Sequence, residues 1–176
     1  MTLASYVTSL RVLLILPIMY CMSYEYEYSA LILFLLAGFT DYLDGYIARR
    51  TLKETSLGAL LDLLADKLLV CLVLIWCAIL SESVLIIIAT LIIITRELMI
   101  SSLRQFLVEK TGENIVKVTY IAKGKTTIQI IAISFLILSP EMGNLFYIST
   151  VFLIWIAAWM SIYTLYNYFK NYSQYL

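Results

Sequence analysis

Apolar residues follow one another along the chain in six long stretches that are separated by short polar segments. The stretches cover residues 10–22, 29–47, 59–80, 84–95 with a continuation to 107, 126–138 and 145–166. An α-helix needs about 20 mostly apolar residues to cross the hydrocarbon core of a bilayer. The pattern therefore predicts an all-α, polytopic integral membrane protein with six transmembrane helices. The first and fifth stretches are short, so we expect those helices to continue into the flanking polar residues.

The composition supports a membrane protein and excludes several classes of function. Of the 176 residues, 62% are hydrophobic and 14% are charged, against about 45–50% and about 25% in soluble domains, and the mean hydropathy is +0.93. Six spans leave only short loops, so we expect one membrane-embedded domain over residues 1–176. Histidine is absent, which excludes imidazole as a catalytic base or metal ligand. The twelve basic and twelve acidic residues include no basic run, so we expect no nucleic-acid partner.

Basic residues are confined to alternate connections between the apolar stretches. The segments 23–28, 81–83 and 139–144 contain glutamate but neither lysine nor arginine. Cytoplasmic loops of membrane proteins carry an excess of lysine and arginine, so the remaining connections and both termini should face the cytoplasm. The basic residues on that expected cytoplasmic side are Arg49, Arg50, Lys53, Arg104, Lys110, Lys117, Lys123, Lys125 and Lys170.

All the aspartates of the chain fall between residues 41 and 66. Asp41 and Asp44 lie near the end of the second apolar stretch, and Asp62 and Asp66 lie near the start of the third. At 100° per residue, spacings of three and four place each pair on one face of its helix. Consecutive helices that are joined by a short loop should be antiparallel neighbours. Four carboxylates from two helices should therefore converge at the cytoplasmic end.

Four neighbouring carboxylates need positive partners, because their like charges repel one another. Two divalent cations would balance the four charges, and an all-oxygen ligand set favours hard ions such as Mg²⁺ or Mn²⁺. Two such ions close together can clamp a phosphoryl group for in-line displacement. Two alternatives remain. The carboxylates could be solvated helix ends that pair with Arg49, Arg50 and Lys53, or they could form the filter of a divalent-cation channel or transporter.

The aspartates belong to a motif that resembles the signature of the CDP-alcohol phosphotransferase family. The family pattern D-x2-D-G-x2-A-R-x8-G-x3-D-x3-D is matched at all eight fixed positions and in its spacing. Thr8, Arg11 and Pro17 resemble the family's N-terminal pattern, and residues 95–104 and 122–129 are similar to the phosphatidylglycerophosphate synthase branch. The matched signature residues are Asp41, Asp44, Gly45, Ala48, Arg49, Gly58, Asp62 and Asp66.

The resemblance implies transfer of a phosphatidyl group from CDP-diacylglycerol to an alcohol, with release of CMP and no covalent intermediate. Asp41, Asp44 and Asp62 would bind the two divalent cations. Asp66 would complete the metal site and accept the proton of the acceptor hydroxyl as a general base. The resemblance further implies a homodimer among the lipids of a bacterial inner membrane, with its active site on the cytoplasmic face. The residues expected to contact the CDP-lipid are Thr8, Gly45, Ala48, Arg49 and Gly58.

Basic residues near the fourth and fifth stretches indicate where an anionic acceptor could bind. Glycerol 3-phosphate, the acceptor that the branch resemblance implies, would need a cationic pocket of its own. Arg96 and Arg104 lie about 80° apart on the fourth predicted helix, and Lys123 and Lys125 open the fifth. An arginine at membrane depth is a functional candidate by default. Alternatively, Arg96 pairs with Glu97 or a lipid phosphate, and the lysines only orient their helix. A cardiolipin or phosphatidylserine synthase, which uses another acceptor, is the alternative within the family.

Overall fold

The chain folds into a bundle of α-helices. The computed structural model describes residues 3–51, 56–111 and 120–172, and the side chains of residues 11–40, 64–65, 67–110 and 124–172. Within these ranges every regular element is an α-helix, so the all-α prediction is confirmed. The helices of the described ranges are α1 (Leu3–Ser23), α2 (Glu27–Thr51), α3 (Ser56–Ser81), α4 (Val84–Thr111), α5 (Tyr120–Leu138) and α6 (Asn144–Tyr172).

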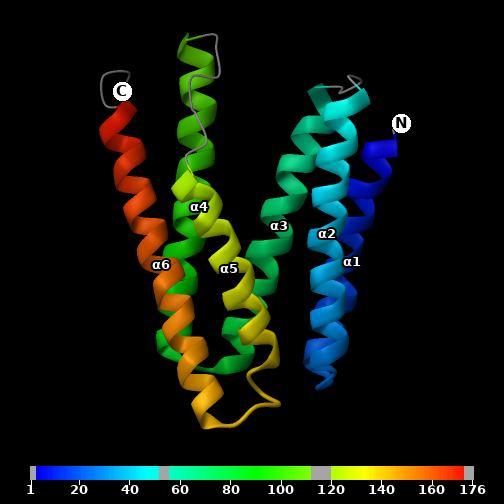
Figure 1. Cartoon of the computed structure of the whole chain (residues 1–176), viewed down its shortest axis with the longest axis vertical. Coiled ribbons are helices and arrows are strands. Elements are labelled where there is room, and N and C mark those ends of the chain that lie inside the picture. Colours follow the sequence, from blue (N-terminus) through cyan, green and yellow to red (C-terminus); the bar gives the residue numbers. More distant parts are fainter. Residues whose placement is uncertain (1–2, 52–55, 112–119, 173–176) are drawn as a thin grey trace.

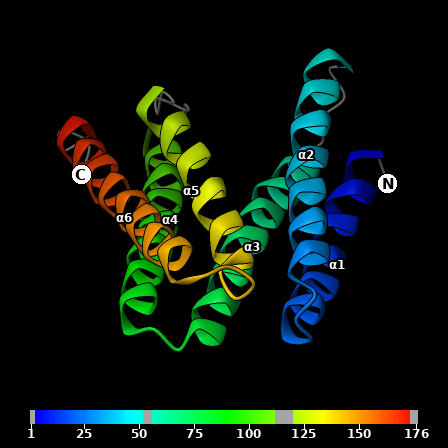
Figure 2. The same cartoon turned by 60° about the horizontal axis from the view of Figure 1, so that its bottom comes forward.

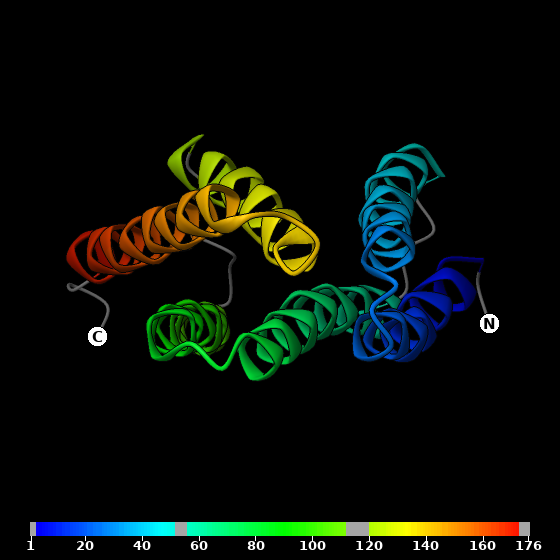
Figure 3. The same cartoon turned by 90° about the horizontal axis from the view of Figure 1, so that it is seen from below.

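The helices alternate in direction along the bundle. The turns from α1 to α2, α3 to α4 and α5 to α6 lie at the lower end of Figure 1, and the first turn of α1 and the last turn of α6 lie at the upper end. Helix α1 packs against α2 and α3, whereas α4 and α5 both pack against α6. These two groups meet where α3 contacts α4 and where α5 contacts α2 and α3 (Figure 2). Viewed from below, α3 lies between α1 and α4 (Figure 3).

The turn between α1 and α2 is tight because α1 ends in a hydrogen-bonded cap. The Tyr26 backbone N–H donates to the carbonyl oxygen of Cys21 at 2.8 Å. Glu25, directly before Tyr26, has a φ of 60°. This bond and a left-handed residue are typical of the Schellman type of helix end. Helix α2 can therefore begin at Glu27 and return antiparallel to α1.

Aliphatic and small side chains fill the interior of the bundle. One buried cluster contains residues from each of α1 to α6. Fully buried alanines such as Ala30, Ala89 and Ala157 allow helix backbones to approach one another closely, as in membrane proteins. Large apolar side chains also cover the outside, where Leu16 is 68% and Phe152 is 67% exposed. An apolar outer surface of this kind would promote aggregation in water, whereas it suits contact with lipid.

Within the described residues, two helices are long and apolar enough to cross a membrane. They are α4, over Val84–Lys110, and α6, over Asn144–Tyr172. Shorter apolar segments occur in the other helices, at Arg11–Ser23, Glu27–Thr40, Lys67–Ser81 and Gly124–Leu138. Helices α1 and α5 extend beyond the short apolar stretches that predicted them, as expected. The crossing of the membrane by all of these helices stays a prediction.

Candidate functional site

The signature motif lies where α2 ends and α3 begins. Asp41 and Asp44 fall in the C-terminal part of α2, and Asp62 and Asp66 fall in the N-terminal part of α3. Both helices pack against α1, and these parts of them lie at the same end of the bundle. The motif side chains and those of the other predicted CDP-lipid contacts lie outside the described residues. Among the side chains that are described, no group of three or more His, Cys, Asp or Glu could hold a metal ion. The convergence of the four carboxylates therefore stays a prediction.

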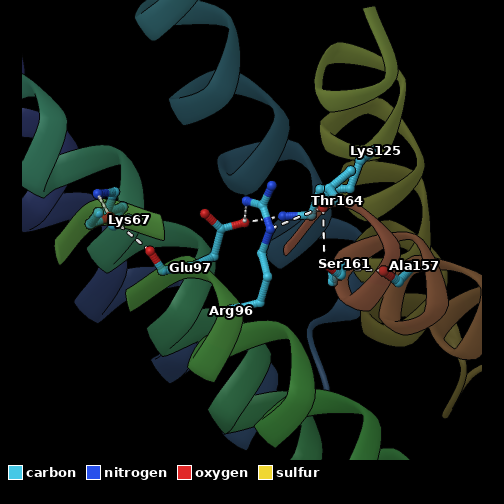
Figure 4. A network of polar contacts seen from close by, with 8 residues as sticks. Lys67, Arg96, Glu97, Lys125, Ala157, Ser161 and Thr164 are labelled. Atoms are coloured by element: carbon cyan, nitrogen blue, oxygen red, sulfur yellow. Dashed lines mark hydrogen bonds and ion pairs between the residues drawn. The ribbon is translucent and has the colours of Figure 1, made fainter. Parts of the chain in front are cut away.

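A network of polar side chains crosses the interior between α3, α4, α5 and α6 (Figure 4). Its centre is the carboxylate of Glu97 on α4. Arg96 Nη1 donates to Glu97 Oε1 at 3.3 Å, and Lys125 Nζ on α5 forms an ion pair with the same oxygen. Arg96 is 7% exposed and Lys125 is 2% exposed. A buried charge without a partner is strongly destabilising, so Glu97 is what allows both cations to lie inside the bundle.

Helix α6 fixes the orientation of the Arg96 guanidinium. Arg96 Nε donates to Thr164 Oγ1 at 3.1 Å, and the Thr164 hydroxyl donates in turn to the backbone oxygen of Ser161 at 3.0 Å. Both α6 residues are buried. Arginine has five N–H donors in a rigid plane, so these contacts set the direction of the donors that Thr164 and Glu97 leave unused.

The network reaches α3 through Lys67, the residue after Asp66. Lys67 Nζ donates to Ser101 Oγ on α4, and the Ser101 hydroxyl donates to the backbone oxygen of Glu97 at 2.7 Å. Arg104 lies three residues beyond Ser101 on the same face of α4. Lys67 and Ser101 therefore connect α3 to the turn of α4 that carries Arg96 and Glu97.

Most of the predicted acceptor residues belong to this network or lie beside it. Arg96 and Lys125 share the Glu97 carboxylate, and Arg104 lies close enough to Lys67 to act on its charge. The side chain of Lys123 lies outside the described residues. The Arg96–Glu97 pair that was expected of a structural arginine is present, and with the bond to Thr164 it uses two of the five N–H groups of the guanidinium.

Several residues of the network were not predicted as site residues. Lys67, Glu97, Ser101 and Thr164 connect the predicted cations to one another and to α3 and α6. One usable signal was the charge of Lys67 inside the apolar stretch 59–80. Another was the spacing of Glu97, Ser101 and Arg104, which places them on one helix face. No sequence pattern indicated Thr164, because its partner lies on a helix distant in sequence.

Comparison with known sequences identifies the family. The sequence profile of the CDP-alcohol phosphatidyltransferase family matches residues 1–163. A protein of Rickettsia bellii named CDP-diacylglycerol–glycerol-3-phosphate 3-phosphatidyltransferase is 42% identical over 146 residues, which are 82% of this chain and 78% of that protein. A protein with this name from Rickettsia typhi is 38% identical over 174 residues (96% and 95%), and one from Escherichia coli is 33% identical over 134 residues (73% and 74%). These bacterial relatives and the apolar α4 and α6 indicate a membrane-associated protein. The chain belongs to the CDP-alcohol phosphatidyltransferase family.

Proposed function

We infer that this chain transfers the phosphatidyl group of CDP-diacylglycerol to glycerol 3-phosphate, which gives phosphatidylglycerophosphate and CMP. Relatives at 33–42% identity are named for this reaction. The observation in this chain that supports the choice of acceptor is the charge of the network. Among its described side chains one carboxylate, Glu97, lies among the cations Lys67, Arg96, Arg104 and Lys125. This excess of positive charge suits an anionic acceptor.

The signature residues suit a pair of hard divalent cations. Asp41, Asp44, Asp62 and Asp66 offer only carboxylate oxygens, the ligand type that Mg²⁺ and Mn²⁺ prefer. These residues would hold the two cations between the end of α2 and the start of α3. Two bound cations would neutralise the donor phosphates and make the phosphorus more electrophilic.

Side chains of α2 and α3 carry out the proton transfer and stabilise the charge on the leaving group. Asp66 accepts the proton of the acceptor hydroxyl, and the hydroxyl oxygen forms a bond to the phosphorus that carries diacylglycerol. The bond between this phosphorus and the bridging oxygen breaks, and CMP leaves with the electron pair. Arg49 stabilises the negative charge that grows on CMP. Gly45, Ala48 and Gly58 leave room for the nucleotide, with Thr8 of α1 as a further contact.

The acceptor phosphate binds on the side of α4 and α5. Arg96, Arg104, Lys123 and Lys125 supply its positive charge, separate from the aspartates, so that the two anionic substrates do not compete for one site. In this proposal all six helices cross the inner membrane, both termini are cytoplasmic, and the active site lies at the cytoplasmic face. The homodimer rests on the family resemblance alone.

An acceptor panel tests the proposed reaction. The purified protein is incubated with CDP-diacylglycerol, Mg²⁺ or Mn²⁺, and either glycerol 3-phosphate, serine or phosphatidylglycerol, and both CMP and the lipid product are measured. We expect phosphatidylglycerophosphate from glycerol 3-phosphate only, and no CMP when the divalent ions are chelated. Turnover with serine or phosphatidylglycerol instead would identify one of the other synthases. Metal flux in proteoliposomes, without CMP release in the assay, would identify a channel or transporter.

The first prediction concerns the general base. Asp66→Asn should lower kcat by roughly 10³-fold or more, because it removes both a proton acceptor and a metal ligand. The variant should keep the melting temperature of the wild type, since amide and carboxylate have nearly the same shape. Glu109→Gln, at an exposed position of α4, is the matched control and should retain full activity. Substantial turnover by Asp66→Asn would remove Asp66 as the base.

A further inference from the structure

Lys67 of α3 contacts Ser101 of α4, and a second cation, Arg104, lies three residues beyond Ser101 on the same face of α4. Lys67 Nζ has the neutral hydroxyl of Ser101 as its hydrogen-bond partner, and the charges of Glu97, Arg104 and Arg96 act on it. An ammonium group has three N–H donors, so among the described side chains the bond to Ser101 leaves two of them unused. Lys67 is only half-buried, so these donors are accessible from outside the network.

Arg104 adds a donor that lacks a partner. Its Nε is buried and has no hydrogen-bond partner among the described residues. A buried donor that is left unsatisfied destabilises the fold, and two neighbouring cations add their mutual repulsion. An anion between Lys67 and Arg104 would remove both penalties. Arg96 and Lys125, in contrast, already share the carboxylate of Glu97.

We propose that Lys67 is a further ligand of the acceptor phosphate, which it binds together with Arg104 on the Ser101 face of α4. This inference rests on the proposed function, because it assigns a residue to the acceptor of that reaction. Lys67 directly follows Asp66, so their Cα atoms are about 3.8 Å apart. One short segment of α3 therefore holds both the anionic group of the acceptor and the base for its hydroxyl. This arrangement favours acceptors that carry a phosphate near the reacting hydroxyl.

The test compares variants that remove or keep the charge of residue 67. Lys67→Gln removes the charge and keeps a donor toward Ser101, and Lys67→Arg keeps the charge. We expect Lys67→Gln to raise the KM for glycerol 3-phosphate by about tenfold or more, the value of one charge-assisted hydrogen bond. Competitive inhibition by inorganic phosphate should weaken by the same factor. The KM for CDP-diacylglycerol should stay within about twofold of the wild type, and Lys67→Arg should recover most of the lost affinity.

Two controls separate phosphate binding from a structural role. Lys110→Gln changes an exposed lysine near the end of α4 and should leave both KM values unchanged. Ser101→Ala frees Lys67 Nζ from its hydroxyl partner without loss of charge, so it should raise the KM for glycerol 3-phosphate less than Lys67→Gln does. If Lys67→Gln does not fold, Ser101→Ala is compared with Lys110→Gln instead, and an equal KM for glycerol 3-phosphate would contradict the inference.

The outcomes distinguish this inference from the proposed function. If the wild type uses glycerol 3-phosphate and Lys67→Gln has the same KM as Lys110→Gln, the phosphate does not bind Lys67 and only this inference fails. A structural role for the lysine would show as a rise in both KM values together with a lower melting temperature. Lys67→Arg would then fail to restore the KM values and the melting temperature of the wild type. If the wild type uses only acceptors without a phosphate, both the inference and the proposed function fail.

Discussion

A single residue in the left-handed backbone region shapes each of two turns at the lower end of the bundle. Glu25, between α1 and α2, has a φ of 60°, and Glu82, between α3 and α4, has a φ of 50°. An L-residue with a side chain pays about 1–2 kcal/mol for this conformation, which glycine adopts freely. The chain thus uses glutamate where the backbone favours glycine, on a side of the bundle whose connections carry no lysine or arginine.

Glycine at position 25 should therefore stabilise the protein. Glu25→Gly is expected to raise the free energy of unfolding by about 1 kcal/mol, measured by thermal unfolding in detergent. Glu109→Gly, at an exposed position within α4, should lower the same quantity by about 1 kcal/mol, because glycine is a poor helix former. Equal destabilisation by both substitutions would show that Glu25 contributes a contact that outweighs its backbone cost.

Individual charges in the site were predictable, whereas their partners were not. Arg96 was predicted as a site residue because an arginine at membrane depth is a functional candidate, and Lys125 because an anionic acceptor needs a cationic pocket. The role of Glu97 depends on which side chain of α5 lies opposite to it. That neighbour is Lys125, 28 residues away in the sequence, and only the packing of the helices brings the two together.

Helix α4 connects the site to the rest of the fold. Its residues contact α3 through Ser101, α5 through Glu97 and α6 through Arg96. A second, smaller apolar cluster continues this contact toward the end of α4, where Leu103 and Leu107 pack with Tyr168 of α6. The position of α4 therefore decides the relative placement of all cations in the network.

Loss of the Glu97 charge should loosen the contacts of α4. Glu97→Gln leaves Arg96 and Lys125 buried without a carboxylate, which should lower the free energy of unfolding by about 3–5 kcal/mol. Thermal unfolding in detergent measures this loss, and Glu109→Gln, on an exposed face of the same helix, should change stability by less than about 0.5 kcal/mol. Equal melting temperatures for the two variants would mean that the Glu97 ion pairs contribute nothing to the fold.

Apolar patterning predicted the middle of each helix better than its ends. The stretches 10–22 and 126–138 lie within α1 and α5, but the helices begin at Leu3 and Tyr120. Polar residues continue a helix as readily as apolar ones, because the backbone bonds are the same and several polar residues have high helix propensity. The hydrophobic pattern reports the part of a helix that lies in lipid or in the core.

At the scale of the whole molecule, exposed acidic residues lie at one end of the bundle and exposed basic residues lie at the other. The exposed Glu25, Glu82 and Glu141 lie in the turns at the lower end, whereas Lys110 and Lys170 lie near the ends of α4 and α6 at the upper end. The signature motif lies at that same upper end. If the basic end faces the cytoplasm, CDP-diacylglycerol reaches the motif from the cytoplasmic leaflet, where its nucleotide stays in water and its acyl chains stay in the bilayer.

Thiol labelling tests this orientation directly. In a variant that lacks the native cysteines, Glu141→Cys places a thiol in the exposed turn between α5 and α6, and Lys110→Cys places one near the exposed end of α4. A membrane-impermeant thiol reagent should label residue 141 in intact cells with an open outer membrane, and residue 110 only after the inner membrane is permeabilised. Lys170→Cys, near the end of α6, should behave like residue 110.

The opposite pattern would invert the topology and place the motif on the outer face, where cytoplasmic glycerol 3-phosphate cannot reach it. Labelling of all three positions from outside a sealed membrane would contradict a single span between residues 110 and 141 and between residues 141 and 170. The native cysteines to be replaced are Cys21, Cys71 and Cys77.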